Sequence, residues 1–356
     1  MSDQPTIKKI FDFSLLRRIF GYARPYKRRF FLSVFLSIVL AVLAPVRPLL
    51  INFTIHDVMQ RMNDENALII SLLINITLIQ VGILIIETLL RFYFSFLTSW
   101  LGQTVVRDMR VEVYRKILSL NLSQFDKTPI GTLTTRTIND IEAINDVFSE
   151  GLIPIVADLL SIIAILTAMF WTNWQLTLIC LIPFPLMIIA TYYFKESVNK
   201  SFIRVRNAVA ALNAFVQEHI TGMQVIQAFT AEEREHKKFN RINRDHRDSN
   251  IRAIFAYSVF FPLVEIVLAV SMGLLVWFAA RQAYNLSAQE AANITGHIVS
   301  FILMLNLLFR PLRVIADKFN VLQMGMVASE RVFSVLDNPD ITDNGGQQKP
   351  EEIKGA

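Results

Sequence analysis

Apolar residues in this chain gather in six long runs, separated by polar stretches of very different length. The runs cover residues 30–52, 67–92, 150–171, 174–194, 254–279 and 295–316. Each holds about 20 residues or more, the length that a helix needs to cross about 30 Å of hydrocarbon at 1.5 Å per residue. The pattern predicts an all-α polytopic membrane protein with six transmembrane helices.

The third and fourth runs are joined by a very short turn. Only Thr172 and Asn173 lie between Trp171 and Trp174, and tryptophan favours the boundary between lipid and water. We therefore expect two neighbouring antiparallel spans with this turn at the membrane surface.

Basic residues mark one side of the predicted membrane domain. Eight, six, eleven and four Lys and Arg residues fall in the four segments on that side, which are residues 1–29, 101–147, 195–252 and 317–356. The loops on the other side contain only Arg61 and Arg281. Because basic loops stay in the cytosol, both termini are expected there. A soluble bundle of buried helices would not place its basic residues in alternate loops.

Composition agrees with a membrane protein and argues against several other classes. Of the 356 residues, 53% are hydrophobic and 18% are charged, against about 25% charged in soluble domains. The net charge of +5 follows the topology, so no nucleic-acid partner is indicated. The single cysteine, Cys180, lies inside an apolar run and has no second cysteine for a disulfide or a thiolate metal site.

An N-terminal segment, residues 1–29, precedes the first span. Phe11, Leu15, Ile19 and Tyr22 recur near helical spacing, with arginines between them. This pattern favours a short helix in the membrane interface, with its basic residues near lipid phosphates. An amphipathic helix packed on protein is the alternative.

Two long polar segments on the cytosolic side, residues 92–149 and 195–253, continue the flanking spans. A further 30 helical residues would project about 45 Å beyond the membrane. We interpret the segments as helical arms that contact a cytosolic partner. Soluble bundles that fold back on themselves are the alternative.

The turn of the first arm fits the pattern F-D-x4-G-x-L-x2-R-x3-D. The matching residues are Phe125, Asp126, Gly131, Leu133, Arg136 and Asp140. The pattern resembles the first intracellular loop of ATP-binding-cassette (ABC) exporters, where it surrounds a short coupling helix. Pro129 and Gly131 are expected to break the descending helix there. Asn139 and Asp140 precede the renewed apolar period of the ascending helix.

The turn of the second arm fits E-x3-G-x3-I-x2-F-x2-E, from Glu218 to Glu232. It is similar to the second coupling segment of the same family. Gly222 would permit a sharp bend or a close backbone approach, and Phe229 would anchor the turn in a groove of a partner. Residues 223–229 and 261–265 look closest to bacterial multidrug and lipid exporter subunits, which often pair as heterodimers.

A third motif follows the sixth span. Residues 317–337 resemble the helix that joins an exporter's last span to its nucleotide-binding domain, and residues 338–356 have the Pro, Gly and Gln content of a linker. The three motifs stand in the family's order over nearly the whole chain. The expected organisation is therefore the N-terminal segment 1–29, a six-span domain over 30–316, the helical extension and the linker.

The resemblance implies the substrate-translocation domain of an ATP-driven exporter of drugs, lipids or other amphipathic molecules in the bacterial plasma membrane. Its implied partners are membrane lipid, a second half-transporter of the same or a related kind, and the nucleotide-binding domains of both subunits. ATP and Mg would bind in those domains, and no cofactor is expected in this chain.

The chain contains no G-x4-G-K-[ST] phosphate loop, so it is not expected to be an enzyme by itself. We expect an ATP-binding cassette to follow in a longer protein, and a separately encoded membrane domain is the alternative. A membrane enzyme would need clustered His, Asp or Ser on facing helices. Glu235 and His236 occupy a charged helical stretch and are interpreted as a solvated face. A receptor or scaffold whose arms bind a partner without transport is the remaining alternative.

Charged residues inside the spans are costly, and they either pair or line a water-filled path. The candidates for a substrate path are Arg47, Glu87, Arg91, Asp158, Glu265 and Arg310. Glu87 and Arg91 are one helical turn apart, so a self-neutralising pair is the alternative for them. Arg47 lies between two prolines, where the first span is expected to kink. Arg310 lies near the cytosolic end of its span, where snorkelling is the simpler explanation.

Overall fold

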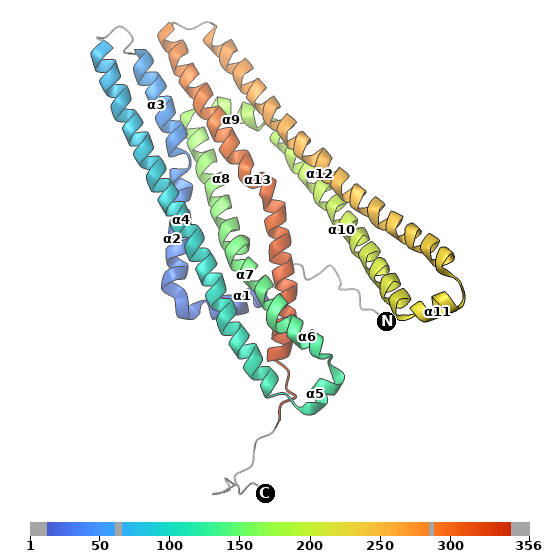
Figure 1. Ribbon diagram of the computed structural model, residues 1–356. Coiled ribbons are helices and arrows are strands. Elements are labelled where there is room, and N and C mark those ends of the chain that lie inside the picture. The colour runs from blue at the N-terminus through green and yellow to red at the C-terminus, as the bar shows by residue number, and fades with distance from the viewer. Residues whose placement is uncertain (1–12, 61–65, 285–287, 343–356) are drawn as a thin grey trace, which may run out of the picture. The chain divides into compact units, whose positions relative to one another are not determined.

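The computed structural model describes residues 13–60, 66–284 and 288–342, and helices make up nearly all of this part (Figure 1). Within these described residues, six helical segments are long and apolar enough to cross a membrane by length and composition. They are Arg24–Val58, Ile70–Leu118, Ile130–Thr172, Trp174–Thr221, Glu232–Ala283 and Ile294–Leu312. The predicted all-α architecture with six spans is confirmed.

The first span is interrupted at its prolines. α2 (Lys27–Leu43) ends before Pro45, and α3 (Val46–Gln60) continues the span. Pro48 falls in the first turn of α3, where a missing N–H costs no intrahelical hydrogen bond. The predicted kink is therefore a break between two helices.

The third and fourth spans meet at the predicted short turn. α8 (Leu152–Thr172) ends beside Asn173, whose side-chain oxygen accepts hydrogen bonds from the backbone N–H groups of Gln175 and Leu176 at 3.0 and 3.1 Å. Asn173 thereby caps α9 (Trp174–Leu181). The fourth span is interrupted in turn: α9 ends at Leu181, and the next helix begins after Pro183, which is its N-cap.

The two predicted arms are continuations of the spans and not folded-back bundles. α4 (Asn66–Leu118) has 53 residues, α10 (Phe184–Thr221) has 38 and α12 (Glu232–Ala283) has 52. α4 and α12 are each about 80 Å long, more than twice the thickness of the hydrocarbon layer. α10 and α12 pack side by side as a hairpin, closed by α11 (Met223–Ala228) (Figure 1).

The chain divides into two compact units. Of the described residues, the first unit contains 13–50, 66–165 and 310–342, and the second contains 51–60, 166–284 and 288–309. Within the first unit, one face of α4 supplies much of the core. Its buried residues recur every four positions, which places them on one side of the helix: Leu97, Leu101, Val105, Met109 and Val113.

The N-terminal helix α1 (Phe13–Tyr22) packs on protein. Leu16 and Ile19, with Ala23 just after the helix, are buried in the core of the first unit. The ring of Tyr22 stacks on Phe333 of α13 (Ala288–Leu336), with 6.3 Å between ring centroids. The apolar face of α1 is thus covered by its own unit, as the alternative interpretation expected. Phe11 lies outside the described residues.

The ascending helix of the first arm contains two single-turn π-helices, η3 (Arg136–Asp140) and η4 (Val147–Gly151). α13 crosses this helix at Gly325. A Cβ on Gly325 would lie 2.9 Å from the carbonyl oxygen of Ala143 and against the side chain of Val147. The crossing therefore depends on the missing side chain at this glycine.

Large apolar faces remain uncovered within the chain. In the most apolar stretch of the second span, only 6% is buried within the chain. α2 exposes a stripe spaced by three and four residues along one face, formed by Phe31, Phe35, Ile38 and Val42. Because contiguous apolar surface of this extent is unstable in water, these faces fit contact with lipid or with another membrane-embedded chain.

Candidate coupling site

The first turn is built from two short helices, α5 (Leu122–Lys127) and α6 (Ile130–Thr135). The descending helix α4 already ends at Leu118. The expectation that Pro129 and Gly131 break that helix was wrong in position. Pro129 instead separates α5 from α6 as the N-cap of α6.

Contacts with a distant segment accompany the early end of α4. Leu120 forms an isolated antiparallel bridge with Ile341. The Thr342 N–H donates to the Ser119 carbonyl at 2.8 Å, and the Asn121 N–H donates to the Asp340 carbonyl at 3.2 Å. The described start of the predicted linker is thus bound to the start of the first turn.

The motif residues of the first turn fall into two groups. An exposed group comprises Phe125, Asp126, Pro129 and Gly131. Leu133 and Asp140 are buried, and Asp140 forms an ion pair with Arg331 of α13 at 3.6 Å. Arg136 is half-buried and lines, together with Asp140 and Arg331, a surface cavity of about 320 Å³. The buried group holds the turn, and the exposed group is free to contact a partner.

The second turn consists of α11, which lies between the ends of α10 and α12. Gly222 caps α10 with φ −93°, an ordinary value, and a Cβ there would lie 3.2 Å from the Glu218 carbonyl oxygen. In the part of the chain that the structure describes, the non-glycine residue with positive φ is Thr230, at 50°. The Ala231 N–H donates to the Ile226 carbonyl at 2.9 Å, which closes the C-terminus of α11 in the manner of a Schellman motif.

Apolar side chains project from the second turn. Phe229 is 79% exposed, and Ile220 and Val225 are exposed as well. Glu218 and Glu232 are exposed at the two ends of the motif. An exposed aromatic residue on a short, well-defined turn is a suitable anchor for a partner protein.

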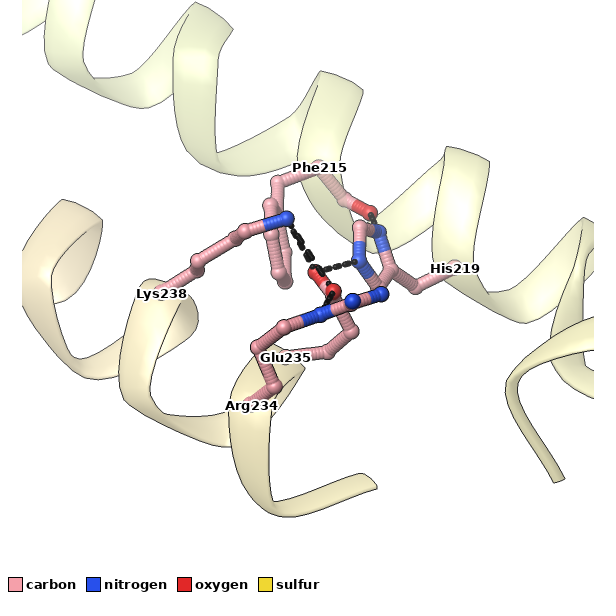
Figure 2. Close-up of polar contacts among 5 residues, drawn as sticks. All are labelled: Phe215, His219, Arg234, Glu235 and Lys238. Carbon is pink, nitrogen blue, oxygen red and sulfur yellow. Dashed lines mark hydrogen bonds and ion pairs between the residues drawn. The ribbon is translucent and has the colours of Figure 1, made fainter. Parts of the chain in front are cut away.

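A contact between half-buried His219 and buried Glu235 closes the base of this turn (Figure 2). His219 Nε2 on α10 lies 3.0 Å from Glu235 Oε2 on α12. Arg234 Nε and Lys238 Nζ also contact the Glu235 carboxylate, at 2.8 and 2.9 Å. Glu235 was expected on a solvated face but is buried, because a partner 16 positions away covers it. His236 is exposed, as expected.

The charges of this cluster stabilise one another. The hydrogen bond from His219, followed by those from Lys238 and Arg234, lowers the pKa of Glu235 to about 2. The hydrogen bond with Glu235 raises the pKa of His219. Both residues lie on the arms, well beyond the apolar residues 174–194 and 254–279.

The candidate path residues have separate environments. Glu87 and Arg91 form the expected ion pair within α4, at 2.9 Å. Asp158 of α8 pairs with Lys318 of α13, a partner 160 positions away that the sequence pattern did not indicate. Three others are exposed in the chain as described: Arg47, Glu265 and Arg310.

Comparison with known proteins gives a consistent picture. Residues 30–312 match the family described as ABC transporter transmembrane region. The chain is 28% identical, over 99% of its length, to the uncharacterized ABC transporter ATP-binding protein YknV of Bacillus subtilis, of which it covers 57%. It is 25% identical, over 92% of its length, to the ATP-dependent lipid A-core flippase of Syntrophus aciditrophicus, of which it covers 53%. It is 26% identical, over 96% of its length, to the putative multidrug export ATP-binding/permease protein YgaD of Bacillus subtilis, of which it covers 58%. The chain thus spans little more than half the length of these relatives.

Proposed function

Because the chain belongs to the ABC transporter transmembrane region family, we propose that it is the translocation domain of an ATP-driven exporter. The observation that carries this proposal is the pair of short turns at the ends of long continuous helices. The second of these turns exposes Phe229. ATP and Mg would bind in nucleotide-binding domains outside this chain, against which the turns would dock.

The helices supply a physical route from the turns to the spans. α10 and α12 run without interruption from the second turn into apolar segments. A packed helix pair moves as a rigid body more readily than it bends. Closure of nucleotide-binding domains on ATP would therefore tilt the arms and alternate the side of the membrane to which the path opens.

The substrate class proposed is an amphipathic drug or lipid. Support comes from the predominantly apolar spans and from relatives named as a lipid A-core flippase and a multidrug export protein. The working unit would be a dimer, with a second half-transporter of the same or a related kind. We place it in a bacterial plasma membrane with both termini in the cytosol, as the basic loops predict.

Substitution of Phe229 tests the proposal. In the protein that carries this chain together with its nucleotide-binding domain, Phe229→Ala should leave ATP hydrolysis measurable. It should lower ATP-dependent efflux of an amphipathic dye from inverted vesicles about tenfold or more, since truncating an aromatic anchor costs about 2 kcal/mol.

Tyr284→Ala is the matched control, because Tyr284 is a similarly exposed aromatic residue that follows the far end of α12. It should transport like the unsubstituted protein. Normal efflux with Phe229→Ala would remove the coupling role of this turn and favour a receptor or scaffold.

A further inference from the structure

The second turn is too short to hold its own shape. α11 has six residues, whereas isolated helices need about 12–15 residues to be even marginally stable in water. Its position must therefore come from the ends of α10 and α12. His219 lies in the last turn of α10 and Glu235 in the first turn of α12, so their contact joins these two ends (Figure 2).

Both ring nitrogens of His219 face hydrogen-bond acceptors. Nδ1 lies 2.8 Å from the Phe215 carbonyl oxygen, and Nε2 lies 3.0 Å from Glu235 Oε2. A neutral imidazole carries only one N–H, so only the doubly protonated ring donates to both acceptors. The ring also stacks on Phe215, with 3.6 Å between centroids, and an aromatic face favours a cation.

We propose that His219, as an imidazolium, is a positioning residue for the second turn. It ties α10 to α12 through Glu235, and loss of its proton loosens α11. The tie itself stands on the geometry of the arm. Its consequence for transport rests on the proposed coupling function.

The charged side chains around His219 must be considered together to find which one changes its protonation state near neutral pH. On α10 the neighbouring charge is Glu218, and on α12 the charges are Arg234, Glu235 and Lys238. α11 contributes no titratable side chain. With a pKa of about 2, Glu235 stays ionised at neutral and alkaline pH. The group that changes charge near neutral pH is therefore His219.

The direction of the pH dependence follows from the raised pKa of His219. A group whose pKa is higher in the folded state contributes its full stabilisation below its ordinary pKa of about 6.5. That stabilisation is lost as the pH rises through the higher folded value. Arg234 and Lys238 keep their contacts with the Glu235 carboxylate over this pH range. Deprotonation of His219 therefore removes the contact between α10 and α12 but leaves the contacts within α12.

Hydrogen exchange of residues 222–231 tests the proposal on the full chain in lipid nanodiscs. Protection, corrected for intrinsic exchange rates, should fall about fivefold between pH 6 and pH 8.5, the scale of one charged hydrogen bond at a partly exposed site. His219→Gln and Glu235→Gln should show the low protection at both pH values. His219→Lys, a permanent cation, should restore protection and remove the pH dependence.

His236→Gln is the control, since it removes an exposed histidine of α12 next to Glu235, and it should behave like the unsubstituted chain. If His219→Gln keeps the protection and pH dependence of the unsubstituted chain, the positioning role is overturned. If Glu235→Gln does not fold, the comparison of His219→Gln with His219→Lys still decides the question.

Efflux measurements separate this inference from the proposed function. If exchange responds as described but Phe229→Ala transports normally, the positioning role stands and the coupling role of the turn falls. If exchange does not respond, the positioning role falls whatever the efflux shows.

Discussion

Arg18 and Asp337, 319 positions apart, form a two-pronged ion pair. The guanidinium nitrogens Nη1 and Nη2 donate to the two carboxylate oxygens at 2.5 and 2.6 Å. The guanidinium also lies 4.1 Å above the ring of Phe333. Residues 337–342 are thus held both by α1 and by the bridge between Leu120 and Ile341. A pull on the predicted linker would therefore be transmitted to α1 and to the first turn.

Removing this ion pair should destabilise the chain in a pH-dependent way. The hydrogen bond from Arg18 lowers the pKa of Asp337, so the pair stabilises the fold above the ordinary Asp pKa of about 3.9. The contribution is lost as the pH falls through the lower folded value. Arg18→Gln should cost about 0.5–1 kcal/mol at pH 7, since both side chains are partly exposed.

Thermal unfolding midpoints in detergent check this prediction. Arg18→Gln should melt lower than the unsubstituted chain at pH 7, and the difference should shrink by pH 3. Arg17→Gln is the matched control, because Arg17 is an exposed neighbour on the same helix. Equal midpoints for the two variants at pH 7 would contradict the role of Arg18.

A side chain at Gly325 should disrupt the crossing of α13 with the ascending helix. Gly325→Ala would place a Cβ 2.9 Å from the Ala143 carbonyl oxygen, and a backbone atom cannot move away cheaply. We expect a loss of about 1–3 kcal/mol from overpacking. Gly82→Ala is the control, since a Cβ at Gly82 meets no atom within 4 Å. It should be neutral or stabilising, and similar melting of the two variants would refute the crossing.

The contributions of Asp158 and Lys318 to the stability of the fold should be coupled. Their side chains are 25% and 23% exposed, so breaking the pair should cost about 1–3 kcal/mol, between the ranges for exposed and buried pairs. Lys318→Met and Asp158→Asn should each lower the melting midpoint, and the double variant should lose less than the sum. Strict additivity of the two losses would show that the pair is not coupled.

Cysteine labelling should test the predicted orientation in the membrane. In a Cys180→Ala background, Trp171→Cys should react with a membrane-impermeant maleimide added to intact cells. Asp126→Cys should react only after the cells are opened, because its loop is expected in the cytosol. Both native side chains are exposed in the chain, so burial does not explain a difference. The reverse pattern of labelling would invert the topology.

The number of spans, the short turn at Asn173 and the length of the arms could all be predicted from the sequence. Each depends on a local property, such as the length of an apolar run or the length of the polar gap between two runs. The motif residues of both turns were also found, because their pattern is written along one continuous stretch. Their roles could not be separated, since Asp140 and Phe125 look alike as motif positions. Only packing buries Asp140 against α13 and leaves Phe125 accessible.

Contacts between distant residues account for what the pattern of residues missed. α4 ends at Leu118, just before the bridge between Leu120 and Ile341. Pro129 and Gly131 carry stronger turn signals than these two residues, so the sequence alone favours a break at the wrong place. Glu235 reads as one more solvated charge until His219 of the neighbouring helix covers it, and Asp158 has no visible partner until α13 brings Lys318 beside it. The length of an apolar run and the placement of charges are properties of single segments, so they can be read from the sequence directly. Burial and pairing are properties of two segments that meet, so they exist only once the helices have packed.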